Sequence, residues 1–248
     1  FYKEGCNMRI LVTGTSCVGK STFINDFLEQ WPMYKCPKRS YREEAKDQNI
    51  KLNKDGDVES QRKIQKILVE QLEAHKNESH VIFDRGPLDN LVYSIWLNIK
   101  KIGNVDDLFI EQSIMKVKQT VSVYDIIFFI PIIKDRPINI VPDDQRDTDP
   151  IFREEIDNLF KGIIQTWHKG KDTFFPKENC PAIIEIFGNP QERIEIAKLY
   201  INSAGDSFTE TDALIDLSNI DTHTDVEEDI KDLIKEKSIS QKNDIILL

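Results

Sequence analysis

Short apolar runs alternate along the chain with longer stretches of helical periodicity. Four runs have the length and the β-branched or aromatic content of buried strands: residues 10–12, 81–83, 126–130 and 182–187. Between and after them, apolar residues recur at three- and four-residue spacing, which predicts helices over about 20–31, 59–76, 87 onward, 105–121, 150–169 and 190–201. The alternation predicts an α/β fold with a doubly wound, mostly parallel sheet, for which we expect five strands.

The first strand runs into a glycine-rich turn that reads Gly14-x-x-x-x-Gly19-Lys20-Ser21 and precedes a helix. Glycines allow backbone N–H groups to curl around phosphate oxygens, and the following helix offers further N–H groups and a positive dipole end. The lysine places a cation on the outer phosphates, and the serine hydroxyl is a ligand for Mg²⁺. The pattern predicts a three-layer P-loop NTPase that binds a nucleoside triphosphate through Gly14, Thr15, Ser16, Cys17, Val18, Gly19, Lys20, Ser21 and Thr22.

The second apolar run ends in Asp84-Arg85-Gly86-Pro87, and the proline suits the first turn of a helix. A hydrophobic strand that ends in aspartate is typical of the carboxylate that faces Mg²⁺ beside the phosphate loop. Ligands of open parallel sheets lie beyond the carboxyl ends of the strands, so Gly14 and Asp84 should meet at one edge. We therefore expect Ser21 and Asp84 to hold the metal.

A polar segment at about 133–150 follows the third apolar run and carries Arg136 and Arg146 before Arg153. This composition predicts a lid, because arginines that close on a phosphoryl group supply charge where it develops. Asp149 and Pro150 then read as the cap and first position of the next helix.

The net charge of −10 is unevenly distributed. Residues 205–248 contain 12 acidic and 4 basic residues, so most of the negative charge belongs to this tail. We expect a kinase-sized domain over residues 8–204 and an acidic, partly helical tail over 205–248. Residues 33–66 instead carry 10 Lys or Arg against 6 Asp or Glu, which suits either an anionic ligand or a solvated face of mixed charge.

The hydropathy and the cysteine and histidine content argue against several classes of protein. No apolar run approaches the roughly 18 residues that span a bilayer, so no membrane partner is expected. The four cysteines lack paired spacing and the four histidines are scattered, which argues against a disulfide framework or a zinc site. These features and the absence of a signal-peptide pattern favour a cytoplasmic protein.

A phosphate loop alone does not separate motors, switches and kinases, but the Asp-Arg pair and the arginine-bearing lid favour a kinase. The motifs Gly14–Thr22, Asp84-Arg85-Gly86 and the Arg146 segment, in this order, resemble those of the P-loop nucleoside and nucleotide kinases. The likeness is to the thymidylate-kinase and deoxynucleoside-kinase branch, and more closely to phage-type AAA-domain proteins related to ribosylnicotinamide kinases. It covers about residues 8–204 and would place a phage-encoded protein in the host cytoplasm.

This resemblance implies ATP and Mg²⁺ as cofactors and a role for each matching residue. Lys20 and Arg146 would neutralise the transferring phosphoryl group, with Ser21 on Mg²⁺. Asp84 would accept the proton of the acceptor hydroxyl or orient the acceptor and the metal water. Arg85 would hold an acceptor or donor phosphate, and Arg42 and Gln61 sit where these kinases contact the acceptor. The family often has an aromatic residue or serine at Gly86, which leaves open a nucleoside or a monophosphate acceptor.

The expected reaction is transfer of the γ-phosphate of ATP to a nucleoside or nucleotide, with a deoxynucleoside or deoxynucleoside monophosphate favoured. One alternative is a kinase for a modified nucleotide within DNA, with nucleic acid as a partner. A second alternative is a nucleotide-dependent ATPase or regulatory module that uses the acidic tail to contact a partner. The sequence leaves the oligomeric state open.

Overall fold

The computed structural model describes residues 8–133, 147–169, 174–176 and 178–208. The chain divides after Ser207, and the strands and helices named below belong to the part before this point. The acidic tail and its predicted helical turns lie outside the described residues, apart from residues 205–208. Within the described part of the chain, no helix combines the length and the apolar character needed to cross a membrane.

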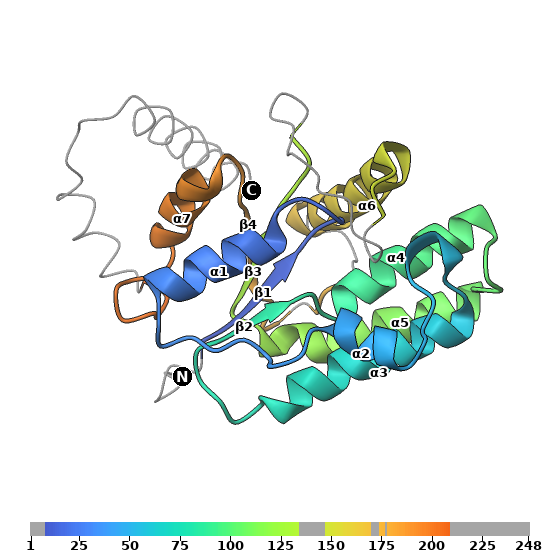
Figure 1. Ribbon diagram of the computed structural model, residues 1–248, viewed down its shortest axis with the longest axis horizontal. Helices are drawn as coiled ribbons and strands as arrows, with labels where there is room; N and C mark the ends of the chain where they lie inside the picture. Colours follow the sequence, from blue (N-terminus) through green and yellow to red (C-terminus); the bar gives the residue numbers. More distant parts are fainter. Residues whose placement is uncertain (1–7, 134–146, 170–173, 177, 209–248) are drawn as a thin grey trace, which may run out of the picture. The chain divides into compact units, whose positions relative to one another are not determined.

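Strands and helices alternate as the sequence predicts (Figure 1). The elements are β1 (Arg9–Thr13), α1 (Lys20–Gln30), α2 (Tyr41–Asp47), the 3₁₀ turn η1 (Asn53–Asp55), α3 (Val58–Ala74), β2 (Val81–Asp84), α4 (Pro87–Lys100), α5 (Asp107–Thr120), the 3₁₀ turn η2 (Val121–Val123), β3 (Ile126–Phe129), α6 (Pro150–His168), β4 (Ala182–Glu185) and α7 (Pro190–Lys198).

The sheet has the strand order β2-β1-β3-β4, and every neighbouring pair is parallel. In this register Val12 of β1 lies opposite Asp84 of β2, so the aspartate ends its strand beside the start of the glycine-rich turn. The α/β class and the parallel sheet are therefore confirmed.

The prediction of five strands was wrong for the described residues, which form four. The segment beside β2 makes a single parallel bridge, Lys35 to Val81, and does not extend into a strand. Pro32 and Pro37 flank this bridge on either side. Proline has no N–H to donate to a ladder, so the pairing stops after one residue.

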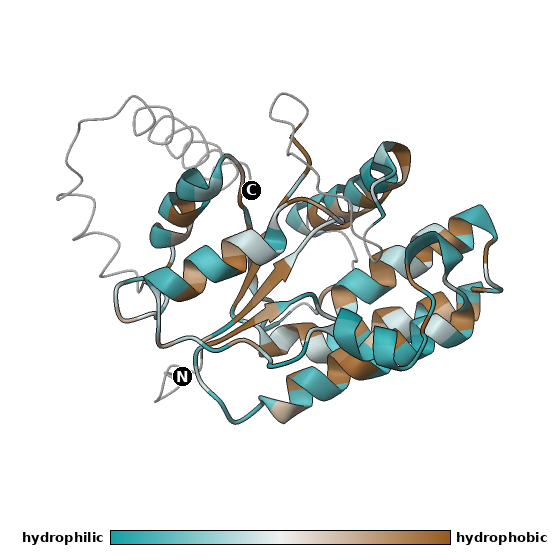
Figure 2. Cartoon of the chain, viewed as in Figure 1, coloured by the Kyte–Doolittle hydropathy of each residue, from teal (hydrophilic) through white to brown (hydrophobic). Residues whose placement is uncertain are grey.

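Two hydrophobic clusters cover the two faces of the sheet. Ile10 and Val12 of β1 belong to one cluster, with side chains from α1 and α7. Leu11 belongs to the other, with side chains from α3, α4, α5 and α6. Figure 1 shows α1 and α7 next to each other, and Figure 2 shows the strands as predominantly hydrophobic. Alternate residues of a strand point to opposite faces, so a continuous apolar run fits a sheet that is covered on both sides.

Capping residues set the helix starts near the carboxyl edge of the sheet. Asp149 accepts hydrogen bonds from the N–H groups of Ile151 and Phe152, and Pro150 occupies the first position of α6, as predicted. Asn189 and Glu192 form a capping box at the start of α7. Because these caps fix where α6 and α7 begin, they also fix the arginines in the first turn of each helix.

Candidate active site

The turn between β1 and α1 has the backbone of an anion-binding loop. Gly14, Cys17 and Gly19 have positive φ angles of 134°, 56° and 84°. A Cβ on Gly14 would stand 2.5 Å from the carbonyl oxygen of Ile130, so a larger residue does not fit there. Helix α1 begins at Lys20, directly after Gly19, so the free N–H groups of its first turn lie at the end of the loop.

Cationic side chains bind the carbonyl oxygens of consecutive loop residues. Lys20 donates to Gly14 at 2.9 Å and to Thr15, Arg153 donates to Ser16 at 2.9 Å and to Cys17 at 3.2 Å, and Arg193 donates to Val18 at 2.9 Å. In a planar trans peptide the N–H points opposite to the C=O. The N–H groups of the units held by Arg153 and Arg193 are therefore turned away from these guanidinium groups, as an anion site requires.

Replacing Arg153 by glutamine is expected to weaken ATP binding about tenfold or more. A hydrogen bond from a charged group contributes about 1.5–3 kcal/mol, and this substitution removes the charge that holds two loop carbonyls. Titration calorimetry with ATP measures the change directly. Arg153→Lys keeps the charge and should recover part of the affinity.

The matched control is Arg62→Gln, because Arg62 is exposed on α3 and stacks on Phe109, away from the loop. It should bind ATP as the unchanged protein does. Equal ATP affinities for Arg153→Gln and Arg62→Gln would contradict the role of Arg153 in shaping the loop.

Lys20 lies inside the loop and is only 6% exposed. Burial, followed by the positive charge of Arg85, lowers the pKa of its ammonium group well below the ordinary value. Asp84 and Asp89 oppose this shift. The ammonium is thus held between loop carbonyls in a strongly charged environment, where the negative charge of a polyphosphate would raise its pKa again.

Asp84 and Arg85 follow each other at the end of β2, but their side chains have different surroundings. The Oδ1 atom of Asp84 is buried and accepts no hydrogen bond from any described residue. The Arg85 side chain is 4% exposed, and its Nη1 atom donates to Asp89 at 3.0 Å and to the carbonyl of Gly14 at 3.3 Å. One arginine therefore contacts the phosphate loop and the first turn of α4.

Gly86 is closely surrounded by side chains. A Cβ at this position would stand 2.8 Å from the hydroxyl of Tyr124 and 3.1 Å from a methyl group of Leu11. Tyr124, which precedes β3, and Leu11 of β1 therefore crowd this position. The N–H of Gly86 donates to Asp89, which locks the start of α4.

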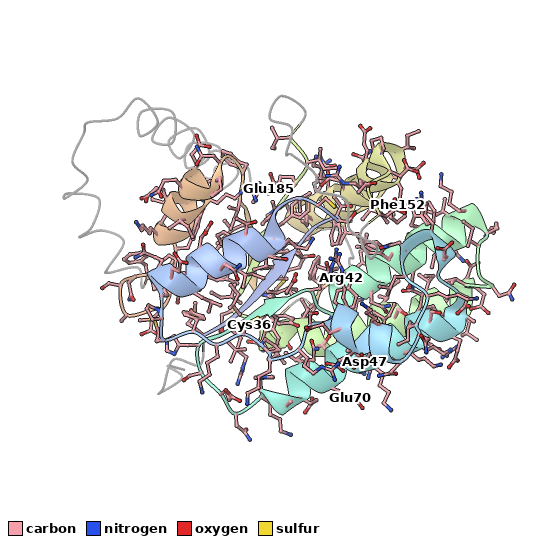
Figure 3. All side chains as sticks on the ribbon, in the orientation of Figure 1. Cys36, Arg42, Asp47, Glu70, Phe152 and Glu185 are labelled. Atoms are coloured by element: carbon pink, nitrogen blue, oxygen red, sulfur yellow. The ribbon has the colours of Figure 1, made fainter. Side chains whose placement is uncertain are left out.

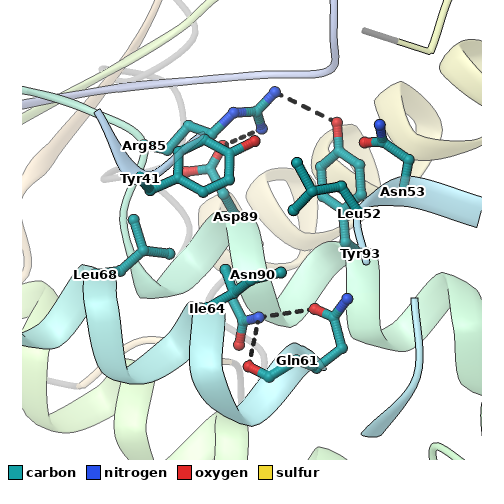
Figure 4. A pocket seen from close by; sticks show the side chains of 10 residues that line it. All are labelled: Tyr41, Leu52, Asn53, Gln61, Ile64, Leu68, Arg85, Asp89, Asn90 and Tyr93. Carbon is teal, nitrogen blue, oxygen red and sulfur yellow. Dashed lines mark hydrogen bonds and ion pairs between the residues drawn. The ribbon is translucent and has the colours of Figure 1, made fainter. Parts of the chain in front are cut away.

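A pocket opens beside Arg85 between α2, η1, α3 and α4 (Figure 4). Its cavity volume is about 30 Å³. Its lining is Tyr41, Leu52, Asn53, Gln61, Ile64, Leu68, Arg85, Asp89, Asn90 and Tyr93. The guanidinium of Arg85 lies 5.7 Å from the ring centre of Tyr41 and 5.3 Å from that of Tyr93. Aromatic and aliphatic walls with a few polar groups at the ends are typical of sites for small organic ligands.

Of the predicted acceptor contacts, Gln61 and Arg85 line this pocket, whereas Arg42 lies beside it. Arg42 stands in the first turn of α2 and donates through Nε to the hydroxyl of Tyr41 at 3.1 Å (Figure 3). The positive charge of Arg42 lowers the pKa of Lys20, as the charge of Arg85 does. The structure thus gathers Lys20, Arg42, Asp84 and Arg85 at one edge of the sheet.

The described end of the predicted lid contacts both the loop and η1. The Ser16 hydroxyl donates to the carbonyl of Asp147 at 2.8 Å. Lys54 of η1 forms ion pairs with Asp147 at 3.3 Å and Asp149 at 2.9 Å. Arg146 itself lies outside the described residues, so its predicted contact with a phosphoryl group stays a prediction.

Sequence reasoning missed several residues of the site. Tyr41, Asp89, Asn90 and Tyr93 line the pocket, and Arg193 binds the loop, although none of them was singled out. A signal was available on α4: Asp89 and Tyr93 follow Arg85 at four-residue steps, and Asp89 and Asn90 are polar residues within an apolar helix. Buried polar residues in such a pattern point to a bonded network or a ligand.

The residues present fit a magnesium ion. Mg²⁺ in phosphotransferases is bound by one or two protein oxygens, substrate phosphates and water. Asp84 supplies a buried carboxylate oxygen without a described partner, and Ser21 is exposed in the first turn of α1. Among the described residues there is no cluster of three or more His, Cys, Asp or Glu that would suit a cage built by the protein alone.

Comparison with known proteins identifies the family and the fold. The family model described as an AAA domain matches residues 9–170. No curated protein sequence matches the chain. Thymidylate kinase from Candida albicans is similar in structure, with 14% identity and a TM-score of 0.56 over 79% of this chain and 90% of that chain.

Two further solved structures have the same fold. Deoxyadenosine kinase from M. mycoides, solved with the product dCMP, has 17% identity and a TM-score of 0.51 over 77% of this chain and 96% of that one. NadR in complex with NR has 13% identity and a TM-score of 0.52 over 82% of this chain. The match covers 51% of the NadR chain, so this chain spans about half its length.

Proposed function

Because the chain belongs to the AAA domain family and has the fold of the P-loop nucleoside and nucleotide kinases, we propose that it is such a kinase. It transfers the γ-phosphate of Mg·ATP to a nucleoside or nucleotide, and a deoxynucleoside or deoxynucleoside monophosphate is the favoured acceptor. The structurally similar proteins include kinases for both kinds of acceptor, one called a thymidylate kinase and one a deoxyadenosine kinase.

One observation carries the proposal. Arg85 donates to the carbonyl of Gly14 in the phosphate loop and also lines the pocket between α3 and α4. A triphosphate on the loop and a small molecule in the pocket would therefore meet at the same guanidinium group. Phosphoryl transfer depends chiefly on holding two reactants in line within a charged, water-poor site, and this arrangement supplies both conditions.

The position of each residue indicates its proposed role in the reaction. Backbone N–H groups of residues 14–20 and Lys20 bind the outer phosphates, and Arg85 stabilises charge on the transferring group. Asp84 receives the proton of the acceptor or orients its hydroxyl. Ser21 and Asp84 would hold Mg²⁺, which supplies further positive charge to the phosphates. Arg146 is proposed to add charge from the lid.

One guanidinium group in the pocket and a second one beside it favour an acceptor that already carries a phosphate. Arg85 lines the pocket, and Arg42 lies next to it through its bond to Tyr41. Planar guanidinium groups are suited to bind phosphate oxygens in pairs. Among the two acceptor classes, a deoxynucleoside monophosphate therefore fits the charges better than an uncharged nucleoside.

The structure gives little support to a kinase that acts within DNA. An open groove of about 590 Å³ adjoins the pocket through Leu52 and Asn53 and contains three lysines of the basic segment 33–66. Two of these lysines are already paired, Lys51 with Asp57 and Lys54 with Asp147 and Asp149. A groove in which two of three lysines are neutralised offers less attraction to a nucleic-acid backbone than its composition suggests.

Transfer of a labelled phosphate tests the proposal. The protein is incubated with Mg²⁺ and ATP labelled at the γ-phosphate, together with deoxynucleosides, their monophosphates or an oligodeoxynucleotide, and the products are separated. We expect label on a small acceptor, and none when Mg²⁺ is chelated. Label only in inorganic phosphate, at a rate independent of acceptors, would indicate an ATPase, and label on the oligonucleotide would indicate a DNA kinase.

A further inference from the structure

The guanidinium group of Arg85 has more hydrogen-bond donors than its described neighbours use. Such a group carries five N–H donors. Nη1 donates to Asp89 at 3.0 Å and to the carbonyl of Gly14 at 3.3 Å, and Nη2 donates to the hydroxyl of Tyr93 at 3.4 Å (Figure 4). No described residue accepts from Nε or from the second hydrogen of Nη2. Two donors therefore remain for a ligand, and paired guanidinium donors suit the oxygens of a phosphate.

The backbone at Arg85 has an unusual conformation that Asp89 helps to hold. Arg85 has a φ angle of 75°, in the left-handed region that residues other than glycine seldom adopt. Its N–H still donates to the carbonyl of Val12 in β1. The N–H of the next residue, Gly86, donates to Oδ2 of Asp89 at 3.0 Å. A single carboxylate thus binds both the backbone after Arg85 and the Arg85 side chain, and such contacts maintain a strained conformation at a functional site.

Asp89 and Arg85 form a buried ion pair. Their side chains are each 3% exposed, and Asp89 stands in the first turn of α4, four residues after the arginine. Removal of one partner from a buried pair leaves an uncompensated charge in the protein interior. Burial and the charge of Arg85 lower the pKa of Lys20, and the carboxylate of Asp89 counteracts both. Asp89 therefore balances positive charge beside the phosphate loop.

This pair also leaves the neighbouring carboxylate available. Among the described residues, Asp89 is the only one whose carboxylate pairs with Arg85. Asp84 precedes Arg85 directly, yet its Oδ1 atom is buried without a described partner. An ion pair between Asp84 and Arg85 would occupy two groups to which the reaction assigns separate roles. Because Asp89 supplies the counter-charge for Arg85, Asp84 remains available to the acceptor or to Mg²⁺.

We propose that Asp89 is a positioning residue of phosphoryl transfer, which holds the Arg85 guanidinium beside the phosphate loop and leaves Nε and one hydrogen of Nη2 for phosphate oxygens. The inference rests on the function proposed above, in which Arg85 stabilises charge on the transferring group. Asp89 acts through Arg85, since its two oxygens already bind Arg85 and Gly86. A donor that is fixed in advance stabilises developing charge without reorganising during the reaction.

The rate of Asp89→Asn tests this role. The amide oxygen of asparagine can still accept from Gly86, but the neutral side chain provides no counter-charge to Arg85. We expect kcat to fall about 10- to 100-fold, because a misplaced donor loses much of its effect on the transferring group. The KM for ATP should stay within about twofold, since the lost interaction acts mainly in the transition state.

A second background separates positioning from a structural effect. When Asp89→Asn is added to Arg85→Met, it should lower kcat by less than about a further twofold, because the group that it positions is gone. Asp157→Asn is the matched control. Asp157 is 1% exposed, pairs with Lys161 four residues later at 2.6 Å, and accepts from the N–H of Ile132. Its substitution should change kcat by the same factor with and without Arg85.

The single variant could be unable to fold with an unpaired arginine, and the double variant removes that charge. The comparison of the double variant with Arg85→Met alone then tests the same expectation. Nitrogen-15 NMR of the guanidinium group gives a further readout that needs no chemical step. The signals of Arg85, identified by their loss in Arg85→Met, should show slow rotation of Nη1 and Nη2 in the unchanged protein and in Asp157→Asn, and fast, averaged rotation in Asp89→Asn.

Each outcome bears on the proposal. An unchanged kcat in Asp89→Asn, an equal loss with and without Arg85, a loss confined to the KM for ATP, or unchanged guanidinium signals would overturn the role of Asp89 and leave the kinase proposal standing. If the unchanged protein transfers phosphate to no acceptor, the proposed function fails on that result alone, and the role of Asp89 in the reaction fails with it.

Discussion

An Asp84→Asn variant should bind ATP nearly as well as the unchanged protein and turn over about a thousandfold more slowly. A positioned general base contributes about 10²–10⁴ to a rate, and the asparagine keeps the shape of the side chain while losing its charge. The buried Oδ1 atom of Asp84, which has no described partner, lies at the end of β2, beside the start of the loop. Calorimetry with ATP and steady-state rates of phosphoryl transfer measure the two quantities separately.

Asp125→Asn is the matched control for this substitution. Asp125 precedes β3, at the opposite end of the sheet, and its carboxylate accepts from the N–H of Arg9. An amide oxygen can still accept that bond, so turnover should change little. Unchanged turnover in Asp84→Asn, or an equal loss in Asp125→Asn, would contradict the role given to Asp84.

A Lys20→Met variant should lose both ATP affinity and turnover, with turnover lower by about 10²–10³. Removing one preorganised donor from a developing negative charge costs about 2.7–4 kcal/mol. Methionine keeps the length of the side chain, so the loss reports the charge that the buried ammonium brings to the phosphates. Initial rates at varied ATP give KM and kcat for the variant.

Lys63→Met, on the exposed side of α3, serves as the comparison for Lys20→Met. Its ammonium pairs with Glu59 at the surface, where an ion pair contributes little, so the rate of this variant should match that of the unchanged protein. A Lys20→Met protein that is folded and as active as Lys63→Met would show that the loop does not bind a reacting phosphate.

The strand, loop and helix at the start of the chain were predictable because their signals are local. The run Ile10–Val12, the spacing from Gly14 to Lys20 and the periodicity after it depend on neighbouring residues alone. The same holds for Asp84, whose position follows from the length of its apolar run. The carboxyl ends of parallel strands meet at one edge, so both motifs were expected at one place, and the register of Val12 with Asp84 confirms it.

The rest of the site depends on contacts between distant segments. Arg153 and Arg193 bind loop carbonyls from helices far along the chain, and no local pattern predicts such a bond. The pocket lies between α3 and α4, so the place of Gln61 and Asn90 in it follows only from the contact between these two helices. The missing fifth strand is a similar case, because the segment at Lys35 pairs with β2 through a single bridge and forms no ladder.

The role of each predicted site residue stays a prediction. Lys20, Asp84 and Arg85 lie together, Gln61 lines the pocket and Arg42 stands beside it. Arg146 and the acidic tail fall outside the described residues, and the acceptor is assigned by chemistry alone. The proposed reaction therefore depends on one spatial claim, that the outer phosphate of the triphosphate faces the pocket across Arg85.

The affinity of a bisubstrate ligand tests that claim most directly. In such a ligand, adenosine and a deoxynucleoside are joined by a polyphosphate chain, in lengths that match a nucleoside or a monophosphate acceptor. If both sites form one active centre, one of these lengths should bind at least about a hundredfold more tightly than ATP or the acceptor alone, because linking makes the second binding event intramolecular. A bisubstrate ligand that binds no more tightly than ATP at either length would contradict the claim.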